Sequence, residues 1–271
     1  QDCIGSFTGA WNGNITNCVS YATVYGRNNV GGIAGFKGQS MRYFAVTDCA
    51  FYGEIKATGS MVGGIVGNGY TAASGPNTIC VTIENCFATG KITGANNVGG
   101  IFGGEGGSAY CWGNGIGRIR NNYFAGTVTA TEANANVGGI IGYMKSLDRY
   151  NDIRDNYYVE ECGAENGVGG VGFIVDKTYK PKSSYQHYGR DDDPLGKGAE
   201  ELSKKIKKDD IKNGTLLQYL QEGTYGGSWV QNGEAYPEIG SEKHIIGILS
   251  RKYGGHEELE AGTERTLYLN G

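Results

Sequence analysis

Aromatic side chains in the segments between repeated units are the residues of this chain best suited to recognise a ligand. Tyrosine and tryptophan rings set among Gly, Ser and Asn can stack on sugar rings or grip a protein partner. Their alternative role is to pack these segments down onto the neighbouring sheet. The candidate ligand-binding residues are Tyr70, Tyr110, Trp112, Tyr143 and Tyr150.

Residue patterns for catalysis are weaker. A metallopeptidase would need an HExxH helix, and no histidine of this chain has that context; the three are His187, His244 and His256. Polysaccharide-degrading enzymes need clustered carboxylates, or a cation held by carboxylates beside a basic residue. The acidic candidates instead fall at different positions of the repeats, at Glu54, Glu84, Glu105 and Glu132.

The acidic run at residues 191–193 is interpreted as a solvated loop, with cation binding as the alternative. No Cys/His spacing indicates zinc. We therefore expect no enzyme activity, no cofactor and no metal, and keep a carbohydrate-active enzyme as the competing hypothesis.

A repeated phrase, VGG followed by an aliphatic residue, organises the first two thirds of the chain. It recurs every 31 to 39 residues, which is typical of a repeat architecture. The leading residues of the five copies are Val30, Val62, Val98, Val137 and Val168. The segments after the copies are insertions that would emerge on one side of stacked units.

A second landmark in each unit is an Asn or Asp two residues after an aliphatic residue. We expect these residues to stack as a structural ladder at a corner, with a file of calcium ligands as the alternative. The ladder residues are Asn17, Asp48, Asn85, Asn121 and Asp155. Each unit holds three short runs with strand periodicity, which predicts three parallel sheets. The expected fold is all-β, a right-handed parallel β-helix of five to six coils; a β-sandwich is the alternative.

The composition argues against nucleic acid and membrane lipid as partners of this chain. The net charge is −4 and the pI about 5.5, so there is no basic face for nucleic acid. No apolar run is long enough for a transmembrane helix, and we expect no membrane insertion. Glycine contributes 49 residues without the strict period of collagen.

Five of the seven cysteines fall into two groups, and Cys3 and Cys162 have no obvious partner. Cys18, Cys49 and Cys86 follow the ladder residues and are expected to form a reduced, inward-facing file. Cys80 and Cys111 lie in successive insertions and are the best disulfide candidates.

The domain boundaries follow from where the repeats stop. Residues 1–172 are assigned to the repeats, with the first coil truncated because Ile4 onward resembles the text from Ile33 onward. Residues 173–240 are assigned to a small C-terminal α/β cap. It should contain a helix over 199–208, a short helix after Gly214 and a hairpin turning at 232–233. Residues 241–271 are extra strands or a linker to a next module.

Units of the form I-x-N-x-x-x-x-G-x-V followed by VGGI-x-G, and then a helix, a Trp and a YP dipeptide, form a known pattern. The supporting residues are 83–92, 119–128, Gly35, Gly67, Gly103, Gly142, Trp229 and Tyr236-Pro237. Over roughly residues 1–240 the chain resembles the GLUG-motif β-helix repeats of bacterial secreted and surface proteins. The fifth unit departs from the pattern, because Phe173 stands where Gly is expected and Cys162 replaces an aliphatic residue.

In that family the repeats occur in adhesin-like proteins and beside the catalytic region of immunoglobulin A-specific metallopeptidases. The resemblance implies a secreted or cell-surface location and a non-catalytic display or adhesion module within a longer polypeptide. Host glycan or host protein would be the partner. The alternatives are a carbohydrate-active enzyme or a substrate-positioning module of a larger surface protease.

Overall fold

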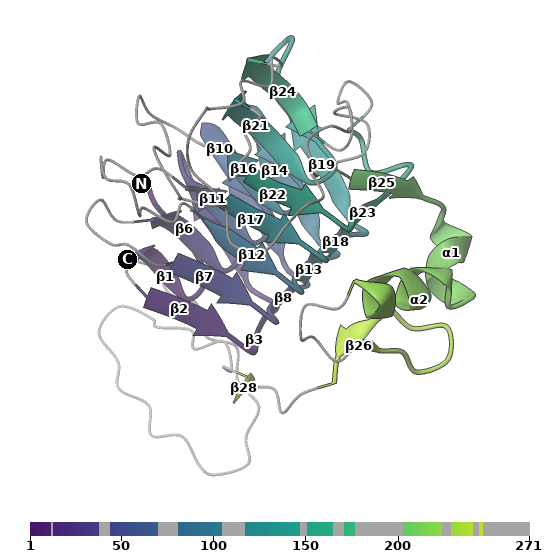
Figure 1. Cartoon of the computed structure of the whole chain (residues 1–271). Helices are drawn as coiled ribbons and strands as arrows, with labels where there is room; N and C mark the ends of the chain where they lie inside the picture. Colours follow the sequence, from purple (N-terminus) through teal and green to yellow (C-terminus); the bar gives the residue numbers. More distant parts are fainter. Residues whose placement is uncertain are drawn as a thin grey trace, which may run out of the picture.

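Parallel strands dominate the structure, a computed structural model shown in Figure 1, and the all-β expectation is confirmed. The structure describes residues 1–11, 13–37, 44–69, 81–104, 117–146, 151–164, 171–176, 203–223, 229–240 and 244–245.

Five parallel sheets are built from the repeats, and the chain visits them in a fixed order. Sheet 1 consists of β1 (Thr8–Trp11), β6 (Ala34–Lys37), β11 (Val66–Asn68), β16 (Phe102–Gly104), β21 (Ile141–Ser146) and β24 (Val171–Asp176). Sheet 2 consists of β2 (Gly13–Thr16), β7 (Phe44–Thr47), β12 (Thr82–Glu84), β17 (Gly117–Arg120) and β22 (Asn151–Arg154).

Sheet 3 has the most strands, seven, and two of them come from the part of the chain that follows the repeats. Its order is β25 (Ser203–Ile206), β23 (Asn156–Val159), β18 (Tyr123–Phe124), β13 (Phe87–Ala88), β8 (Ala50–Phe51), β3 (Cys18–Ser20) and β28 (His244–Ile245). The C-terminal part of the chain therefore supplies a strand at both edges of this sheet.

The last two sheets complete each repeat. Sheet 4 consists of β4 (Thr23–Gly26), β9 (Glu54–Ala57), β14 (Lys91–Gly94) and β19 (Thr127–Ala130). Sheet 5 consists of β5 (Val30–Gly31), β10 (Ser60–Gly63), β15 (Asn96–Gly99) and β20 (Val137–Gly138). Equivalent residues pair from repeat to repeat, as Val62 does with Val30 on one side and Val98 on the other.

The prediction of three sheets is wrong, because two of the three runs in each unit bend sharply. All five ladder residues have positive φ, as at Asn17 (56°) and Asp48 (55°). Asn and Asp tolerate this left-handed conformation better than other side chains. The bend divides the first run into a strand of sheet 2 and a strand of sheet 3. The glycine phrase divides the third run into strands of sheets 5 and 1.

Close packing of sheet 5 against sheet 1 explains the last glycine of the VGGI-x-G pattern. A Cβ built on Gly67 would lie 2.5 Å from the backbone nitrogen of Val30, so backbone packs on backbone. Only a residue without a side chain allows this approach.

The register adds a sixth copy of the phrase and corrects two alignments. Ile4 lies opposite Val30, and Thr8 lies opposite Ala34. Residues 4–9 are thus equivalent to residues 30–35, and the predicted alignment of Ile4 with Ile33 was three residues out. In the fifth unit, the pairing of β21 with β24 places Gly172 opposite Gly142. The fifth unit therefore has the expected glycine, at position 172 and not at position 173, where the spacing from Val168 predicted it.

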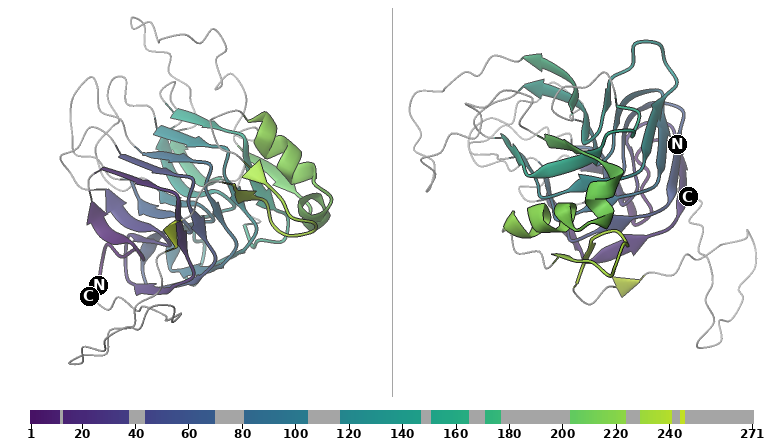
Figure 2. Two further views of the ribbon diagram at one scale, coloured as in Figure 1. Left: turned by 90° about the horizontal axis from the view of Figure 1, so that it is seen from below. Right: turned by 90° about the vertical axis from the view of Figure 1, so that its right-hand side faces the viewer.

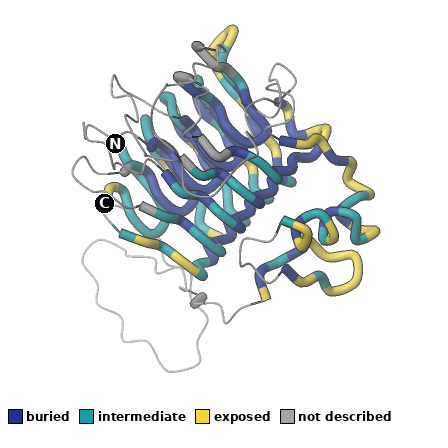
Figure 3. Tube along the Cα trace, viewed as in Figure 1, coloured by how far each residue is buried: buried dark blue, intermediate teal, exposed yellow. Residues whose placement is uncertain are grey.

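The interior holds stacked files of aliphatic and aromatic side chains, and burial is continuous through the stack (Figure 3). Cys49 and Cys86 are fully buried, as the inward file requires. Asn122 and Asn156 continue this file in the next two repeats and are also fully buried. Their side-chain amides donate to backbone carbonyls, Asn122 Nδ2 to that of Ile83 at 2.9 Å and Asn156 Nδ2 to that of Ile119 at 2.6 Å.

Helices α1 (Lys208–Lys212) and α2 (Thr215–Glu222) lie beside sheet 3, together with the antiparallel pair β26 (Trp229–Val230) and β27 (Glu238–Ile239) (Figures 1 and 2). The short helix after Gly214 and the hairpin are confirmed. The helix predicted over 199–208 is wrong in its described part. Ser203–Ile206 forms β25 because the edge of β23 offers a row of backbone partners, and tertiary pairing overrides local helix propensity.

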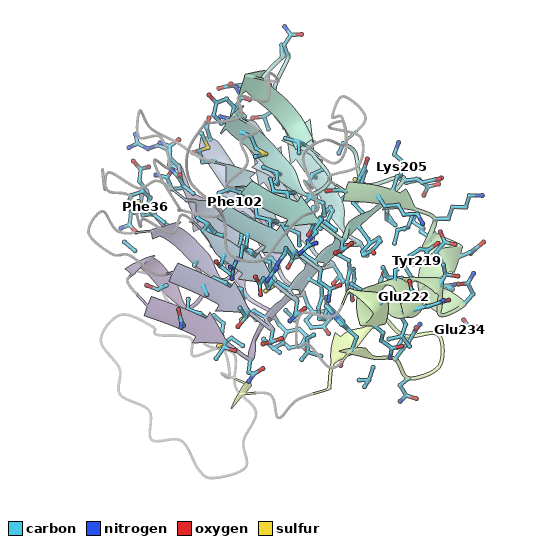
Figure 4. All side chains as sticks on the ribbon, viewed as in Figure 1. Phe36, Phe102, Lys205, Tyr219, Glu222 and Glu234 are labelled. Atoms are coloured by element: carbon cyan, nitrogen blue, oxygen red, sulfur yellow. The ribbon has the colours of Figure 1, made fainter. Side chains whose placement is uncertain are left out.

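Aromatic rings attach these elements to the outer face of sheet 3. Trp229 is 2% exposed, and its ring centroid lies 5.7 Å from that of Tyr123. Tyr219, labelled on α2 in Figure 4, stacks on Tyr157 at 5.5 Å. The Lys204 ammonium lies 3.8 Å from the centroid of the Tyr219 ring, a cation–π contact.

Candidate ligand-binding face

Four insertions leave the stack at equivalent places in successive repeats. Each begins after a strand of sheet 1 and ends before a strand of sheet 2, and these two sheets lie next to each other in Figure 1. The strand pairs that flank them are β6 and β7, β11 and β12, β16 and β17, and β21 and β22. All four insertions are therefore anchored along one side of the stack.

Of the five predicted aromatic residues, the described part of the chain contains Tyr143. Tyr70, Tyr110, Trp112 and Tyr150 lie outside the described residues. Tyr143 is described, and it belongs to β21 and not to an insertion. It is half-buried, opposite Gly104 on one side and Phe173 on the other.

The predicted ladder is joined by side-chain hydrogen bonds in its middle rungs. Asn85 Nδ2 donates to Asp48 Oδ1 at 3.2 Å, and Asn121 Nδ2 donates to Asn85 Oδ1 at 2.9 Å. Burial raises the pKa of the Asp48 carboxyl, and hydrogen bonds from its neighbours oppose this shift. Among the described residues, no group of three or more His, Cys, Asp or Glu is arranged to hold a metal ion. The ladder acts through hydrogen bonds between rungs.

The predicted disulfide pair, Cys80 and Cys111, also lies outside the described residues. The described cysteines, all free, are Cys3, Cys18, Cys49, Cys86 and Cys162. Desolvation raises the pKa of the Cys49 thiol well above its ordinary value, so this side chain stays neutral. Cys18, Cys49 and Cys86 are all free, so no disulfide joins the members of this file.

The outer face of sheet 2 carries three arginines that the sequence analysis did not identify, Arg118, Arg120 and Arg154, beside Glu84, which it did. Arg120 lies opposite Glu84 on one neighbouring strand and Arg154 on the other. Arg118 lies two residues before Arg120 on the same strand and faces the same way, because the side chains of a strand alternate. The buried Ile119 between them is 4% exposed.

An ion pair anchors this set. Arg120 Nη2 donates to Glu84 Oε1 at 2.6 Å and Arg120 Nε donates to the same oxygen at 3.1 Å. Each side chain is only 13% exposed, so the pair is shielded from bulk water and weakly screened by salt. Nearer the start of the stack the same row is neutral, and Thr47 Oγ1 donates to Thr16 Oγ1 at 3.1 Å.

The alternating pattern around each inward isoleucine could have revealed this set. The triplets at 118–120 (RIR) and 152–154 (DIR) flank the aligned Ile119 and Ile153. Once the isoleucines are stacked, the flanking residues must form rows on the outer face.

The outer face of sheet 4 carries several side chains that reach solvent. Lys56 lies 2.7 Å from Glu54 and also approaches the ring of Tyr25, which is 62% exposed. Thr127 and Thr129 are exposed on the same face. This surface provides matched control positions away from the insertions.

Comparisons of the chain with protein-family models, with curated proteins and with solved structures found no match. No helix among the described residues is long and apolar enough to cross a membrane.

Proposed function

We propose that the repeats wind as one continuous right-handed parallel β-helix. Each repeat contributes one strand to each of five sheets in the same order, and equivalent residues pair in register. Crossovers between parallel strands of one sheet are almost always right-handed. An experimentally determined structure with left-handed winding would contradict this.

We further propose that the chain is a non-catalytic display and adhesion module of a secreted or wall-attached bacterial protein. It binds a host glycan or host protein through the side that carries the insertions. The observation that carries this proposal is that all four insertions are anchored between sheets 1 and 2. Stacked repeats are rigid because each contacts its neighbours along its whole length, and they present long surfaces to partners.

The resemblance to GLUG-motif repeats supports the same role, since those repeats occur in adhesin-like surface proteins. The candidate contact residues in the insertions remain Tyr70, Tyr110, Trp112 and Tyr150. Tyr143, in β21, lies at the base of the same side.

Glycan-array binding of the whole chain tests the proposal. The parent should bind a defined set of glycans, and Trp112→Ala and Tyr70→Ala should abolish that binding. Tyr25→Ala removes an exposed tyrosine from sheet 4 and should leave it unchanged. Release of reducing sugar or unsaturated uronate from a polysaccharide would contradict the proposal and favour a carbohydrate-active enzyme.

A further inference from the structure

We propose that Cys18 and Cys49 form a binding site for a soft metal ion that prefers two ligands, such as Cu(I). The site lies in the interior of the stack, where sheet 3 begins in the first two repeats. The proposal does not depend on adhesion, because it shares no residue with the candidate ligand-binding face.

The register of sheet 3 puts three cysteines in one row. The pairing of β3 with β8, and of β8 with β13, begins one residue after each cysteine. Cys18, Cys49 and Cys86 are therefore neighbours in successive repeats. In the register of β28 with β3, His244 takes the next position, opposite Cys18. Four successive positions of the row thus hold residue types that bind metal ions.

The three thiols have the same orientation, because each makes the same hydrogen bond. The Sγ atoms of Cys18, Cys49 and Cys86 donate to the backbone carbonyl two residues earlier, at 3.3, 3.1 and 3.2 Å. Cys49 and Cys86 also reach a carbonyl of the preceding repeat, at 3.8 and 3.4 Å. The hydrogen bond with the Cys49 thiol, together with burial, raises the pKa of Cys18, so these two thiols are direct neighbours.

The spacing of the row suits an ion held by two thiolates in a line. Neighbouring strands lie about 4.8 Å apart, so thiols of one orientation repeat at about that distance. Two metal–sulfur bonds of the length found for zinc, about 2.3 Å, span about 4.6 Å when they are in line. A disulfide instead needs Cβ atoms only about 3.8 Å apart. A linear ion therefore joins the pair with less displacement of the strands than a disulfide requires.

The number and type of ligands select the ion. In the described part of the chain, no group of three or more His, Cys, Asp or Glu side chains could hold a metal ion. The row is linear and offers two thiols at a time, whereas structural zinc takes four ligands. Thiolate sulfur is a soft ligand and favours Cu(I) over hard cations.

Burial indicates which pair of thiols takes the ion. Cys18 is half-buried, whereas Cys49 and Cys86 are 0% exposed, so the ion enters at Cys18. At the other end of the row, Asn122 Oδ1 accepts a hydrogen bond from the backbone N–H of Cys86 at 2.8 Å, and the row of thiols ends there. Cys49, the neighbour of Cys18, is the second ligand.

Binding exchanges protons for the ion. Two S–H bonds break, two Cu–S bonds form, both protons leave to water and the copper stays Cu(I). Burial is the main cause that raises the pKa of Cys49, which opposes the loss of its proton. The positive charge of the ion favours the thiolate form and offsets this cost. The affinity should therefore increase with pH.

Anaerobic titration of the whole chain with Cu(I), in competition with a coloured Cu(I) chelator, tests the proposal. All variants carry Cys80→Ser and Cys111→Ser, which remove the two cysteines outside the described residues. This background should bind one Cu(I) ion with two sulfur ligands in X-ray absorption, and should not bind Zn(II) comparably.

Cys18→Ser and Cys49→Ser should each weaken Cu(I) binding at least about a hundredfold, because even residues that only orient a metal ligand cost 10- to 100-fold. Two free cysteines outside the row are matched controls. Cys3 is half-buried like Cys18, and Cys162 is buried like Cys49. Cys3→Ser and Cys162→Ser should each change the affinity less than about twofold.

Thermal unfolding without metal checks that each variant folds. If Cys49→Ser does not fold, Cys49→Ala replaces it, and Cys18→Ser at the half-buried position decides the result by itself. Unchanged Cu(I) affinity in Cys18→Ser overturns the inference. Equal losses in the Cys3 and Cys162 controls overturn it as well, and so does Zn(II) binding as tight as Cu(I) binding. Glycan binding by a chain that does not bind Cu(I) overturns this inference alone and leaves the proposed function standing.

Discussion

Gly100 packs against the ring of Phe124 across the interior of the stack. A Cβ on Gly100 would overlap both that ring and the backbone carbonyl of Gly139 in the next repeat. Gly139 has the same relationship to the ring of Tyr158. The second glycine of the VGG phrase thus makes room for an aromatic core residue in three described copies, at Gly32, Gly100 and Gly139, whereas Gly64 packs against Ala88 and Ile92.

The substitution Gly100→Ala should destabilise the fold by about 3 kcal/mol, because overpacking here forces both backbone and ring to move. Gly233→Ala is the control. Its Cβ would meet nothing within 4 Å, and its φ of 60° alone should cost about 1 kcal/mol. Urea unfolding measures both. Equal effects at the two sites would contradict the packing role of Gly100.

Sequence periodicity predicted the repeats, their stacking in parallel and the side from which the insertions emerge. It did not predict five sheets. The bend at each ladder residue comes from a positive backbone φ, which leaves no trace in the hydrophobic pattern. The strand Ser203–Ile206 was missed for another reason. Its AEELSKKIKK context has helical periodicity, and only the open edge of β23 makes it a strand.

A second file of left-handed residues, just before the VGG phrase, was also missed. It contains Cys3, Asn29, Met61 and Asn97, with φ between 51° and 62°. Asparagine is common in this conformation and methionine is not. Met61→Asn should therefore stabilise the fold by about 0.5–1 kcal/mol.

The reverse change, Asn97→Met, should destabilise it by at least as much, because Asn97 Oδ1 also accepts a hydrogen bond from Asn136 at 2.7 Å. Chemical unfolding of both variants decides the point. Destabilisation by Met61→Asn would show that the packing of Met61 outweighs its backbone strain.

The half-buried carboxyl of Asp48 should make the stability of the fold depend on pH. Its pKa in the folded protein lies above the ordinary value of 3.8, chiefly because burial disfavours the charged form. The folded protein then binds this proton more tightly than the unfolded chain, so the contribution of Asp48 to stability falls as pH rises from below 3.8 through the folded pKa. Asp48→Asn should stabilise the protein at pH 7 by less than about 1 kcal/mol, since Asp48 is only half-buried.

That gain should shrink as the pH is lowered toward 3, where Asp48 is protonated in both states. Thermal unfolding across pH 3–7 measures it. Asn85→Asp is the reciprocal variant, which places a second carboxylate beside Asp48 and should destabilise the fold at pH 7 but little at pH 3. A gain from Asp48→Asn that does not change with pH would contradict this explanation.

Tyr123 connects the repeats to the hairpin formed by β26 and β27. Its hydroxyl donates to the carbonyl of Pro237 at 2.6 Å, and its side chain is fully buried. Tyr123→Phe should cost about 1–2 kcal/mol, because the carbonyl of Pro237 loses its partner.

Amide exchange should then increase over residues 229–240 more than over the strands of sheet 5. Tyr25→Phe, at an exposed site, should change stability by less than about 0.5 kcal/mol. Uniform acceleration of exchange throughout the chain would show that Tyr123 supports the whole fold and not the hairpin.

For the candidate site, the sequence located the insertions but not the arginines of sheet 2. Glu84 was set aside because the four acidic candidates do not share a position in the repeat. The strand register shows that Glu84 instead forms an ion pair with Arg120, which lies 36 residues later on the neighbouring strand. A pair of this kind is visible only when the isoleucines of successive repeats are placed opposite each other.

Amide hydrogen exchange, with and without the best-binding glycan, tests the location of the binding face most directly. We expect protection over Gly117–Arg120, Asn151–Arg154 and the insertions, and no change over Lys91–Gly94 and Thr127–Ala130 of sheet 4. Protection confined to sheet 4 would contradict the assignment.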